Sequence, residues 1–231
     1  MDQETGTVQL VADPYPPYQY GEGGAIRGVD QEIIAAAFKE HGMNIVTRLL
    51  PWEDCLQFLK EGKAHGLFQI TPTGEREKAY IFSKPLRVAK TVFYRKAENP
   101  LSFGEGVDIS GQLKKHRVGV VRGYSYSPLI DGLGESSRRE ADSQETLLTG
   151  LLRGDFDLIV MDWGVAEYMT QKWAIGNIEK VSGYESTRQL HVAFHPSRQE
   201  IADRFNSGLD KVKEKGIFDR IFECYGLTPF A

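Results

Sequence analysis

Apolar runs of two kinds alternate along the first third of the chain. Residues 8–13 form a short apolar run that predicts a strand, and it ends where the following prolines cannot continue a hydrogen-bonded ladder. Residues 28–42 carry apolar side chains at i, i+4, i+5, i+8 and i+9, which predicts an amphipathic helix ended by Gly42. The elements expected next are a turn at 21–24 within the intervening segment, a strand at 44–50, a helix from Trp52 to about Gly62 and a strand at 66–70.

The same alternation returns in the second half of the chain. Asp142, followed three residues later by Glu145, resembles a capping box for a helix that reaches Gly154. Residues 155–162 are an almost continuous apolar run, as in a buried parallel strand. The other elements expected are strands at 90–96 and 116–123, a helix with Ser127 as N-cap and Pro128 at N1, a strand at 190–196 and an amphipathic segment at 199–225 interrupted by Gly216. Two α/β lobes fit this order better than one continuous sheet.

Composition and charge narrow the possible functions. The 231 residues are 41% hydrophobic and 26% charged, and the formal net charge of -4 gives no sign of a nucleic-acid partner. No apolar run approaches the roughly 20 residues that span a bilayer. The first ten residues lack the basic start and apolar middle of a signal peptide, so any export signal is expected to be absent from this sequence.

Metal and cofactor motifs are not apparent. Cys55 and Cys224 lie far apart without a CxxC partner, which argues against a zinc ribbon or redox motif and leaves a disulfide between them open. His191 and His195 fall in a predicted strand before a proline, so no metal site is expected. The glycines at 21–28 do not have the spacing of a dinucleotide-binding fingerprint. We therefore expect no cofactor.

Polar and aromatic residues gather just after the predicted strands. Ligands of open α/β sheets bind beyond the carboxyl ends of the strands, so these positions are the candidate site. The residues concerned are Asp13, Tyr15 and Tyr18 after the first strand, Trp52 after the second, Gln69 to Arg76 after the third, and Arg122 to Tyr126 and Asp162 in the second half of the chain.

These segments together resemble the type II periplasmic solute-binding proteins of bacterial ABC importers, in the branch that binds polar amino acids. The resemblance spans essentially the whole chain and is most specific in ITPTGEREKAYIFSKPL and in LLTGLLRGDFDLIVMD. It implies a two-lobed α/β fold of the type II periplasmic binding protein class, with a ligand cleft between lobes joined by a two-strand hinge. Residues 1–87 plus 190–231 would form lobe 1 and residues 88–189 lobe 2, with crossings near 86–90 and 185–190.

The resemblance also implies roles for individual residues. Arg76 would hold the α-carboxylate of an amino acid through its planar fork, assisted by Thr71. From the other lobe, Ser125 and backbone N–H groups around Gly123 would approach the same carboxylate. The remaining ligand-binding residues would be Asp162 and Gln69 at the α-ammonium, Tyr15 and Trp52 around the side chain, and Arg122, which would favour an acidic or polar side chain if it points inward. Members selective for basic amino acids tend to carry an acid at the position of Ala12, which weakens a lysine or arginine assignment.

Each residue also has an ordinary structural interpretation. Arg76 could pair with a neighbouring glutamate at the surface, and Asp162 could simply cap a helix. Trp52 and Tyr15 could belong to the core. Arg122 could be a solvent-exposed rim residue.

The function expected is that of a periplasmic or extracytoplasmic binding protein. It would be a monomer that closes on an amino acid and delivers it to an ABC permease in the inner membrane, without catalysis. One alternative is the sensor domain of a transmembrane receptor kinase. A dehydratase on the same fold is a further alternative, and it would need Glu53 or Glu167 as a general acid.

Overall fold

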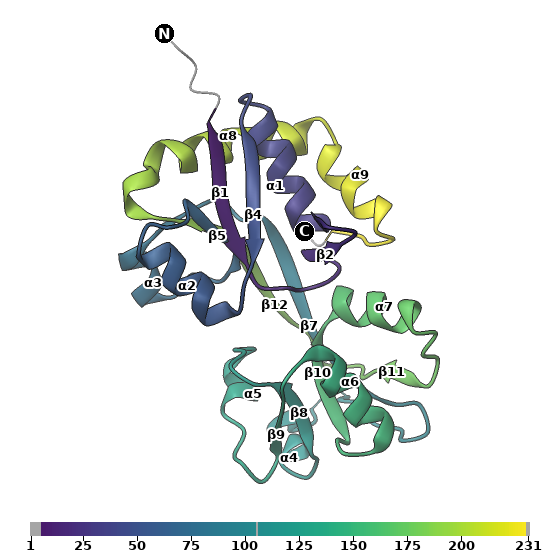
Figure 1. Cartoon of the computed structure of the whole chain (residues 1–231). Coiled ribbons are helices and arrows are strands. Elements are labelled where there is room, and N and C mark those ends of the chain that lie inside the picture. Colours follow the sequence, from purple (N-terminus) through teal and green to yellow (C-terminus); the bar gives the residue numbers. More distant parts are fainter. Residues whose placement is uncertain (1–5, 105, 230–231) are drawn as a thin grey trace. The chain divides into compact units, whose positions relative to one another are not determined.

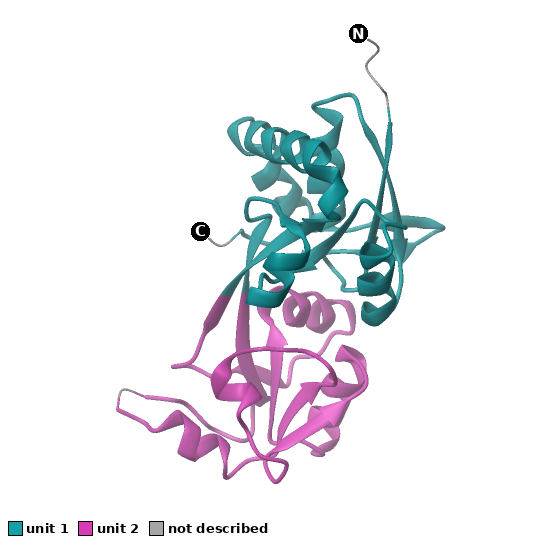
Figure 2. Cartoon of the chain, turned by 90° about the vertical axis from the view of Figure 1, so that its left-hand side faces the viewer, with its two compact units in different colours: residues 1–89, 188–231 teal, residues 90–187 magenta. Residues whose placement is uncertain are grey.

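The computed structural model describes residues 6–104 and 106–229. The chain divides into two compact units, residues 1–89 with 188–231 (unit 1) and residues 90–187 (unit 2) (Figure 2). The chain passes between them within strands β7 (Arg87–Lys96) and β12 (Ser186–Phe194), so unit 2 is one continuous segment and unit 1 contains both ends. The first five residues, on which the argument about an export signal partly depends, lie outside the described part.

Unit 1 is built on a sheet with three parallel strands. β4 (Asn44–Leu49), β1 (Thr7–Ala12) and β5 (Gly66–Ile70) run parallel in that order, and β12 pairs antiparallel with β5 (Figure 1). The other elements of this unit are β2 (Tyr20–Glu22), β3 (Ala25–Arg27), α1 (Val29–Lys39), α2 (Trp52–Lys60), α3 (Gly74–Ala79), β6 (Ile81–Phe82), η1 (Pro196–Arg198), α8 (Gln199–Glu214) and α9 (Ile217–Cys224).

Helix α1 buries the stripe that its sequence predicts and packs against α8. Its buried apolar side chains include Ile33, Ile34 and Phe38, and the Phe38 ring lies 5.4 Å from the ring of Phe205 on α8. Gly208 lets the two helices approach, because a Cβ there would overlap the carbonyl of Ala37. The C-terminal part of the chain is therefore an integral layer of unit 1.

The strands of unit 2 also include three that run parallel. β10 (Leu158–Asp162) and β9 (Arg138–Ala141) flank β8 (Val118–Val121) in parallel, and β10 pairs antiparallel with β7. The other elements are α4 (Ile109–Leu113), α5 (Pro128–Asp131), α6 (Gln144–Arg153), α7 (Trp163–Lys172) and β11 (Ile178–Lys180). Buried side chains of these elements form the core of the unit: Phe93, Phe103, Leu113, Val118, Val120, Tyr126, Ile130, Leu133, Leu158, Val160 and Val181.

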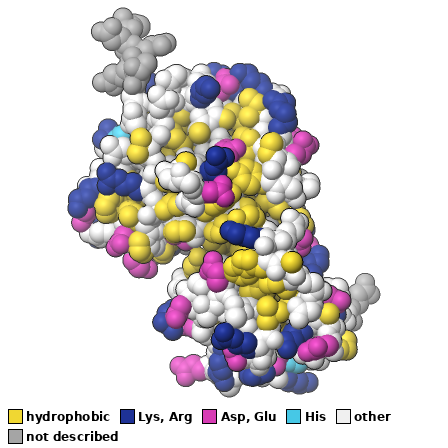
Figure 3. All heavy atoms as spheres, turned by 45° about the vertical axis from the view of Figure 1, so that its right-hand side comes forward, with side chains coloured by type: hydrophobic (Ala, Val, Ile, Leu, Met, Phe, Trp, Pro, Cys, Tyr) yellow, Lys and Arg dark blue, Asp and Glu magenta, His cyan; other side chains and the backbone are white. Residues whose placement is uncertain are grey.

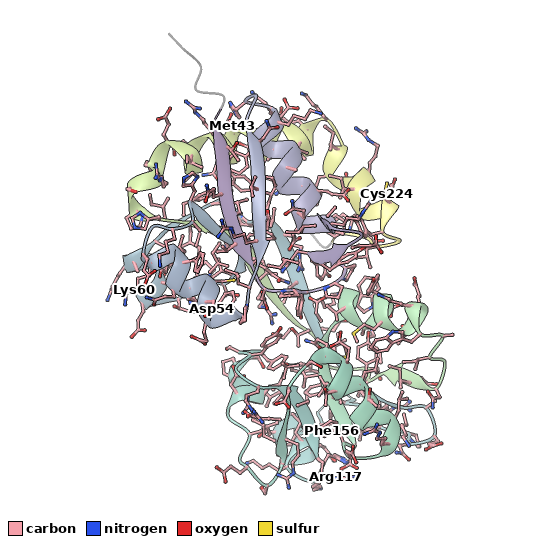
Figure 4. The ribbon with its side chains drawn as sticks, viewed as in Figure 1. Met43, Asp54, Lys60, Arg117, Phe156 and Cys224 are labelled. Carbon is pink, nitrogen blue, oxygen red and sulfur yellow. The ribbon has the colours of Figure 1, made fainter. Side chains whose placement is uncertain are left out.

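The ring of Phe156 fixes α6 against the sheet of unit 2. Phe156 is labelled in Figure 4. Its ring occupies the space that side chains at Gly119 of β8 and Gly150 of α6 would otherwise take. Two glycines on facing elements and one aromatic ring between them thus set the distance between helix and sheet.

Several local expectations are confirmed, and one is wrong. Ser127 caps α5 by accepting from the backbone N–H of Ile130, and Pro128 is at the first helical turn. Gly216, with φ of 64°, separates α8 from α9. The N-cap of α6 is Ser143 and not Asp142, because the Ser143 hydroxyl accepts from the backbone N–H of Thr146. The turn at 21–24 proves to be the tip of the β2–β3 hairpin.

The surface carries charges of both signs. On the face shown in Figure 3, Lys and Arg side chains are interspersed with Asp and Glu in both units. Many of these charges pair locally, as Lys84 does with Asp210 at 2.6 Å. Within residues 6–104 and 106–229, no helix is both long and apolar enough to cross a bilayer.

Candidate functional site

The candidate residues of unit 1 meet at the carboxyl ends of its parallel strands. The register pairs Ala12 of β1 with Leu49 of β4, and Val11 with Leu67 of β5. The segments that follow these strands therefore emerge at one edge of the sheet. They carry Tyr15, Trp52, Gln69, Thr71 and Arg76, and we call this edge site A.

Arg76 is held between two of the other predicted residues. Its Nη1 donates to the carbonyl of Thr71 at 3.1 Å, and its guanidinium carbon lies 5.5 Å from the centre of the Trp52 ring. Arg76 is half-buried, and its own N–H joins the Thr73 side chain that caps α3. No salt bridge of the described residues includes Arg76, so the surface pairing with Glu75 or Glu77 is not seen.

Trp52 packs on the core, as one interpretation of the sequence expected, and it also contacts Arg76. It is half-buried and packs against a core cluster that includes Val11, Leu59 and Leu67. The same ring faces the Arg76 guanidinium, an arrangement that is attractive because the π face is negative. Core packing thus fixes the ring that in turn supports the cation.

Gln69 is the extra residue of a β-bulge. Phe68 and Ile70 of β5 pair with Val192 and His191, consecutive residues of β12, so Gln69 has no partner across the ladder. Its φ of 64° is a conformation that residues other than glycine adopt rarely, and such backbone strain is concentrated at functional sites. A bulge re-aims the side chain, and that of Gln69 accepts a hydrogen bond from Nε2 of Gln19.

Gln19 connects the first loop to this bulge by hydrogen bonds, and no sequence pattern pointed to it. Its side chain is fully buried, and Nε2 also donates to the carbonyl of Asp13 at 3.0 Å. The loop closes on itself through hydrogen bonds between the backbones of Tyr15 and Gln19. Gln19 therefore holds the loop that carries Tyr15 in a fixed position relative to β5.

The first loop is also tied to helix α1. The N–H groups of Val29 and Asp30, at the start of α1, donate to the carbonyls of Pro17 and Tyr18. No side chain caps this helix, so the loop satisfies N–H groups that a helix start leaves open. Tyr15 and Tyr18 are both buried and stack with centroids 6.1 Å apart.

An ion pair lies beneath the same loop. The Arg87 Nε donates to both carboxylate oxygens of Asp30, at 2.8 and 3.0 Å, and the two side chains are 2% and 0% exposed. The Arg87 guanidinium stacks 3.4 Å from the centre of the Tyr18 ring. A buried charge is costly unless it is paired, so the ion pair holds Arg87 in place. Because Tyr18 of the loop stacks on Arg87, the ion pair also restricts the position of the loop.

The candidate residues of unit 2 also gather at a carboxyl edge. β8 lies between β9 and β10 and runs parallel to both, so the segments after these three strands emerge side by side. They carry Arg122, Gly123, Ser125 and Asp162, and we call this edge site B.

Asp162 caps α7, as one interpretation of the sequence expected. Its Oδ1 accepts from the backbone N–H groups of Gly164 and Val165 at 3.0 and 3.3 Å. The side chain is part of a residue only 2% exposed. Oδ1 accepts both hydrogen bonds of the cap, which fixes the carboxylate at the end of β10. The second oxygen, Oδ2, takes no part in the cap.

The loop after β8 is held by Asp131, a residue that sequence reasoning missed. The Ser125 hydroxyl donates to Oδ2 of Asp131 at 2.9 Å, and the N–H of Tyr126 donates to the same carboxylate. Gly123, with φ of 77°, lies in the turn after β8, and helix α5 begins only at Pro128. Donors for an anion here would therefore be backbone N–H groups of the turn.

Arg122 pairs within unit 2. Its guanidinium lies 3.2 Å from Glu140 and 3.1 Å from Asp142, and its side chain is 66% exposed. Its charge is balanced by these carboxylates on the side of β9. This arrangement matches the rim position that the sequence also allowed.

The two cysteines lie in different surroundings. Cys55 and Cys224 are free thiols, the first buried and the second exposed, so they form no disulfide. Burial raises the pKa of the Cys55 thiol to about 12. Within residues 6–104 and 106–229, no cluster of three or more His, Cys, Asp or Glu residues could hold a metal ion.

Comparison with known proteins identifies the family. The profile of the bacterial extracellular solute-binding proteins, family 3, matches residues 8–228. The chain belongs to this family. The two-lobed α/β fold expected from the sequence is that of its structural neighbours.

Individual members of the family are distant in sequence. The chain is 23% identical to a probable histidine-binding protein of Campylobacter jejuni, over 94% of this chain and 83% of the relative. It is 26% identical to an arginine-binding periplasmic protein of Mannheimia haemolytica, over 93% and 89%. These relatives are named as binding proteins, and both are matched over most of their length.

Solved structures with the same fold include a transport protein and a sensor domain. The substrate-binding protein of an amino acid ABC transporter superposes with a TM-score of 0.78 at 20% identity, covering 95% of this chain and 99% of the other. A histidine kinase sensor domain similar to periplasmic binding proteins gives 0.81 at 21% identity, covering 96% and 98%. At this identity the likeness concerns the fold alone.

Proposed function

We propose that this protein captures an amino acid outside the cytoplasm, in the periplasm or another extracytoplasmic location, and delivers it to an ABC permease in the inner membrane. The observation that carries the proposal is the arrangement of Arg76 in site A. A guanidinium supported by the Thr71 carbonyl and the Trp52 ring keeps free N–H groups for a carboxylate, which it can bind in two parallel hydrogen bonds. Family members named as histidine- and arginine-binding support an amino acid as the ligand.

Asp162 of site B is the proposed partner of the α-ammonium group. A carboxylate fixed by a helix cap needs no further ordering to accept an ammonium, which lowers the cost of binding. In this proposal one amino acid is bound by both sites, and closure of the two units is driven by the higher affinity of the closed form. Nothing in this cycle requires a chemical step, so we propose a binding protein and not an enzyme.

Substitution of Arg76 tests the carboxylate role. Arg76→Ala should abolish amino-acid binding in calorimetry and leave the circular dichroism spectrum unchanged, because Arg76 is not part of a buried core. Arg76→Lys, which keeps the charge but loses the fork, should retain only weak binding. Arg48→Ala, at an exposed arginine of β4, is the matched control and should bind normally. Near-normal affinity of Arg76→Ala would remove the role assigned to it.

Substitution of Asp162 tests the ammonium role separately. Asn is as good a helix cap as Asp, so Asp162→Asn should keep α7 and the fold intact. It should weaken amino acids far more than their deaminated analogues, because only the former carry the α-ammonium. Equal losses for both kinds of ligand would contradict the pairing.

A sensor domain is the second candidate, favoured by the structural likeness to a histidine kinase sensor. Both candidates bind a ligand in the same way. They differ in which protein recognises the ligand-bound form, an ABC permease for the transport protein and a kinase for the sensor. The gene on either side of this segment decides between them, since a sensor is followed by a membrane span and a kinase. Stimulation of ATP hydrolysis in a reconstituted permease by the ligand-loaded protein would establish the transport role.

A further inference from the structure

The hydroxyl of Tyr225, which follows helix α9, is hydrogen-bonded to the start of helix α1. It accepts from the backbone N–H of Gly28 at 2.9 Å and donates to the carboxylate of Glu32, one turn further along α1. These bonds join residues that lie 197 and 193 positions apart in the sequence. Helix α9 packs against α1 (Figure 1), so Tyr225 connects two elements that are far apart in the chain.

Gly28 lies between Tyr225 and the first loop. Its φ of 124° is a conformation that glycine adopts readily and other residues rarely do, and a Cβ here would overlap the carbonyls of Pro17 and Tyr18. A serine or aspartate that could cap α1 with its side chain therefore has no room at this position. The loop carbonyls accept from the N–H groups of the next two residues instead. The start of α1 and the first loop are thus held by the same contacts.

The Gly28 peptide group links Tyr225 to site A. The loop that rests on it carries Tyr15, which is expected to pack around the ligand side chain, and Gln19 connects the same loop to the bulge of β5. Without the hydroxyl, the buried N–H of Gly28 would lose its acceptor, which is costly. The peptide group and the loop would then be held less firmly.

The hydroxyl of Tyr225 is not needed to pack α9. The buried side chains of this helix are Phe218 and Phe222, whose ring centres lie 5.1 Å apart. Burial and the hydrogen bond to Glu32 raise the pKa of Tyr225, so its hydroxyl keeps the proton that it donates. The role of the hydroxyl therefore lies in what it binds, the first turn of α1.

We infer that Tyr225 is a positioning residue, whose hydroxyl holds the first loop, and with it Tyr15, in the position that binds the ligand. This inference rests on the proposed function. Tyr225 acts through Gly28 and the loop and does not itself contact the ligand.

Hydrogen exchange of the full chain without ligand tests whether the hydroxyl holds the loop. Tyr225→Phe keeps the ring and removes the hydroxyl. The amide hydrogens of Tyr15, Tyr18 and Gln19, which are bonded within the loop, should exchange about three- to tenfold faster. Those of α8 should change less than about twofold. An equal increase throughout unit 1 would show a general loss of stability and would overturn the positioning role.

Calorimetry tests the consequence for binding. The full chain is screened against the common L-amino acids, and those that bind the wild type are titrated. Tyr225→Phe should bind them about three- to tenfold more weakly. In a Tyr15→Leu background, Tyr225→Phe should cause less than about a twofold further loss, because the ring that it positions is absent. Tyr168→Phe removes a hydroxyl of α7 that accepts from Lys172, and this control should change neither loop exchange nor affinity.

The outcomes separate this inference from the proposed function. Unchanged affinity of Tyr225→Phe would overturn the positioning role while the binding function stood. An equal loss of affinity with and without Tyr15→Leu would overturn it as well, because the hydroxyl would then not act through Tyr15. A wild type that binds no amino acid would overturn the proposed function and this inference together.

Discussion

The buried pair of Arg87 and Asp30 allows a stability prediction with a magnitude. Arg87→Met removes a guanidinium that is 2% exposed and leaves a carboxylate that is fully buried. Breaking such a pair from one side costs about 3–5 kcal/mol, because the remaining charge is uncompensated. Loss of the stacking of Arg87 on Tyr18, at 3.4 Å, acts in the same direction. We expect a loss of about 3–5 kcal/mol in the free energy of unfolding of unit 1.

A second substitution separates the charge from the packing. Asp30→Asn in the Arg87→Met background removes the orphaned carboxylate and should restore most of the lost stability, since neutral groups of similar shape can replace a buried ion pair at little cost. Lys84→Met is the control for a surface pair. Lys84 and Asp210 are 56% and 44% exposed at 2.6 Å, so its loss should be within about 1 kcal/mol.

Urea denaturation followed by circular dichroism measures these differences, and thermal melting gives a parallel value. A chain of this size loses about 2–4 °C per kcal/mol, so Arg87→Met should melt about 6–20 °C lower than the wild type. The reasoning is refuted if Arg87→Met costs no more than Lys84→Met. It is also refuted if the double variant is no more stable than Arg87→Met, because the buried charge would then not be the cause.

Two further predictions concern ionisable groups. The hydrogen bond from Arg117 holds the pKa of the Asp157 carboxyl below its ordinary value of 3.8, so the pair stabilises the fold above that pH and the contribution disappears as pH falls through the folded pKa. Asp157→Asn should therefore be less stable than the wild type at pH 7, and the difference should vanish in acid; a constant difference in urea denaturation across pH would contradict this. Of the two thiols, only Cys224 should react with Ellman's reagent in the native protein at pH 8, because burial raises the pKa of Cys55 to about 12. Two thiols should react after denaturation, and rapid reaction of both in the native state would disprove the burial of Cys55.

The sequence predicted the features of the fold that are determined by residues close together in the chain. The helix expected at 28–42, the cap of α5 by Ser127 and the break at Gly216 follow from local periodicity and backbone chemistry, and all are confirmed. The short strand β9 and the helix α4 were not expected, and α7 was expected only in the interpretation of Asp162 as a helix cap. The cap of α6 was placed one residue too early. Asp142 and Ser143 are both good caps, and the sequence alone does not show that Asp142 is used by Arg122.

The parts of the candidate site that were missed depend on distant partners. The bulge at Gln69 exists because β5 pairs with β12, more than a hundred residues away, and no local pattern reports that pairing. The burial of Gln19 follows from its contact with the same bulge. Ser125 was expected to offer its hydroxyl to a ligand, whereas in the structure this hydroxyl donates a hydrogen bond to Asp131. The resemblance to a family named the residues, and only the fold shows how each is held.

The split of unit 1 across the sequence has a consequence for synthesis. Helix α1 is complete early in the chain, but the surface that α8 covers stays open until residues near 208 have left the ribosome. Unit 2, made of consecutive residues, can collapse first. At about 5–20 residues per second, translation of residues 90–187 leaves the apolar face of α1 exposed for roughly 5–20 s. A nascent chain stalled before α8 should therefore bind a chaperone that recognises apolar helices, and should release it once α8 has emerged.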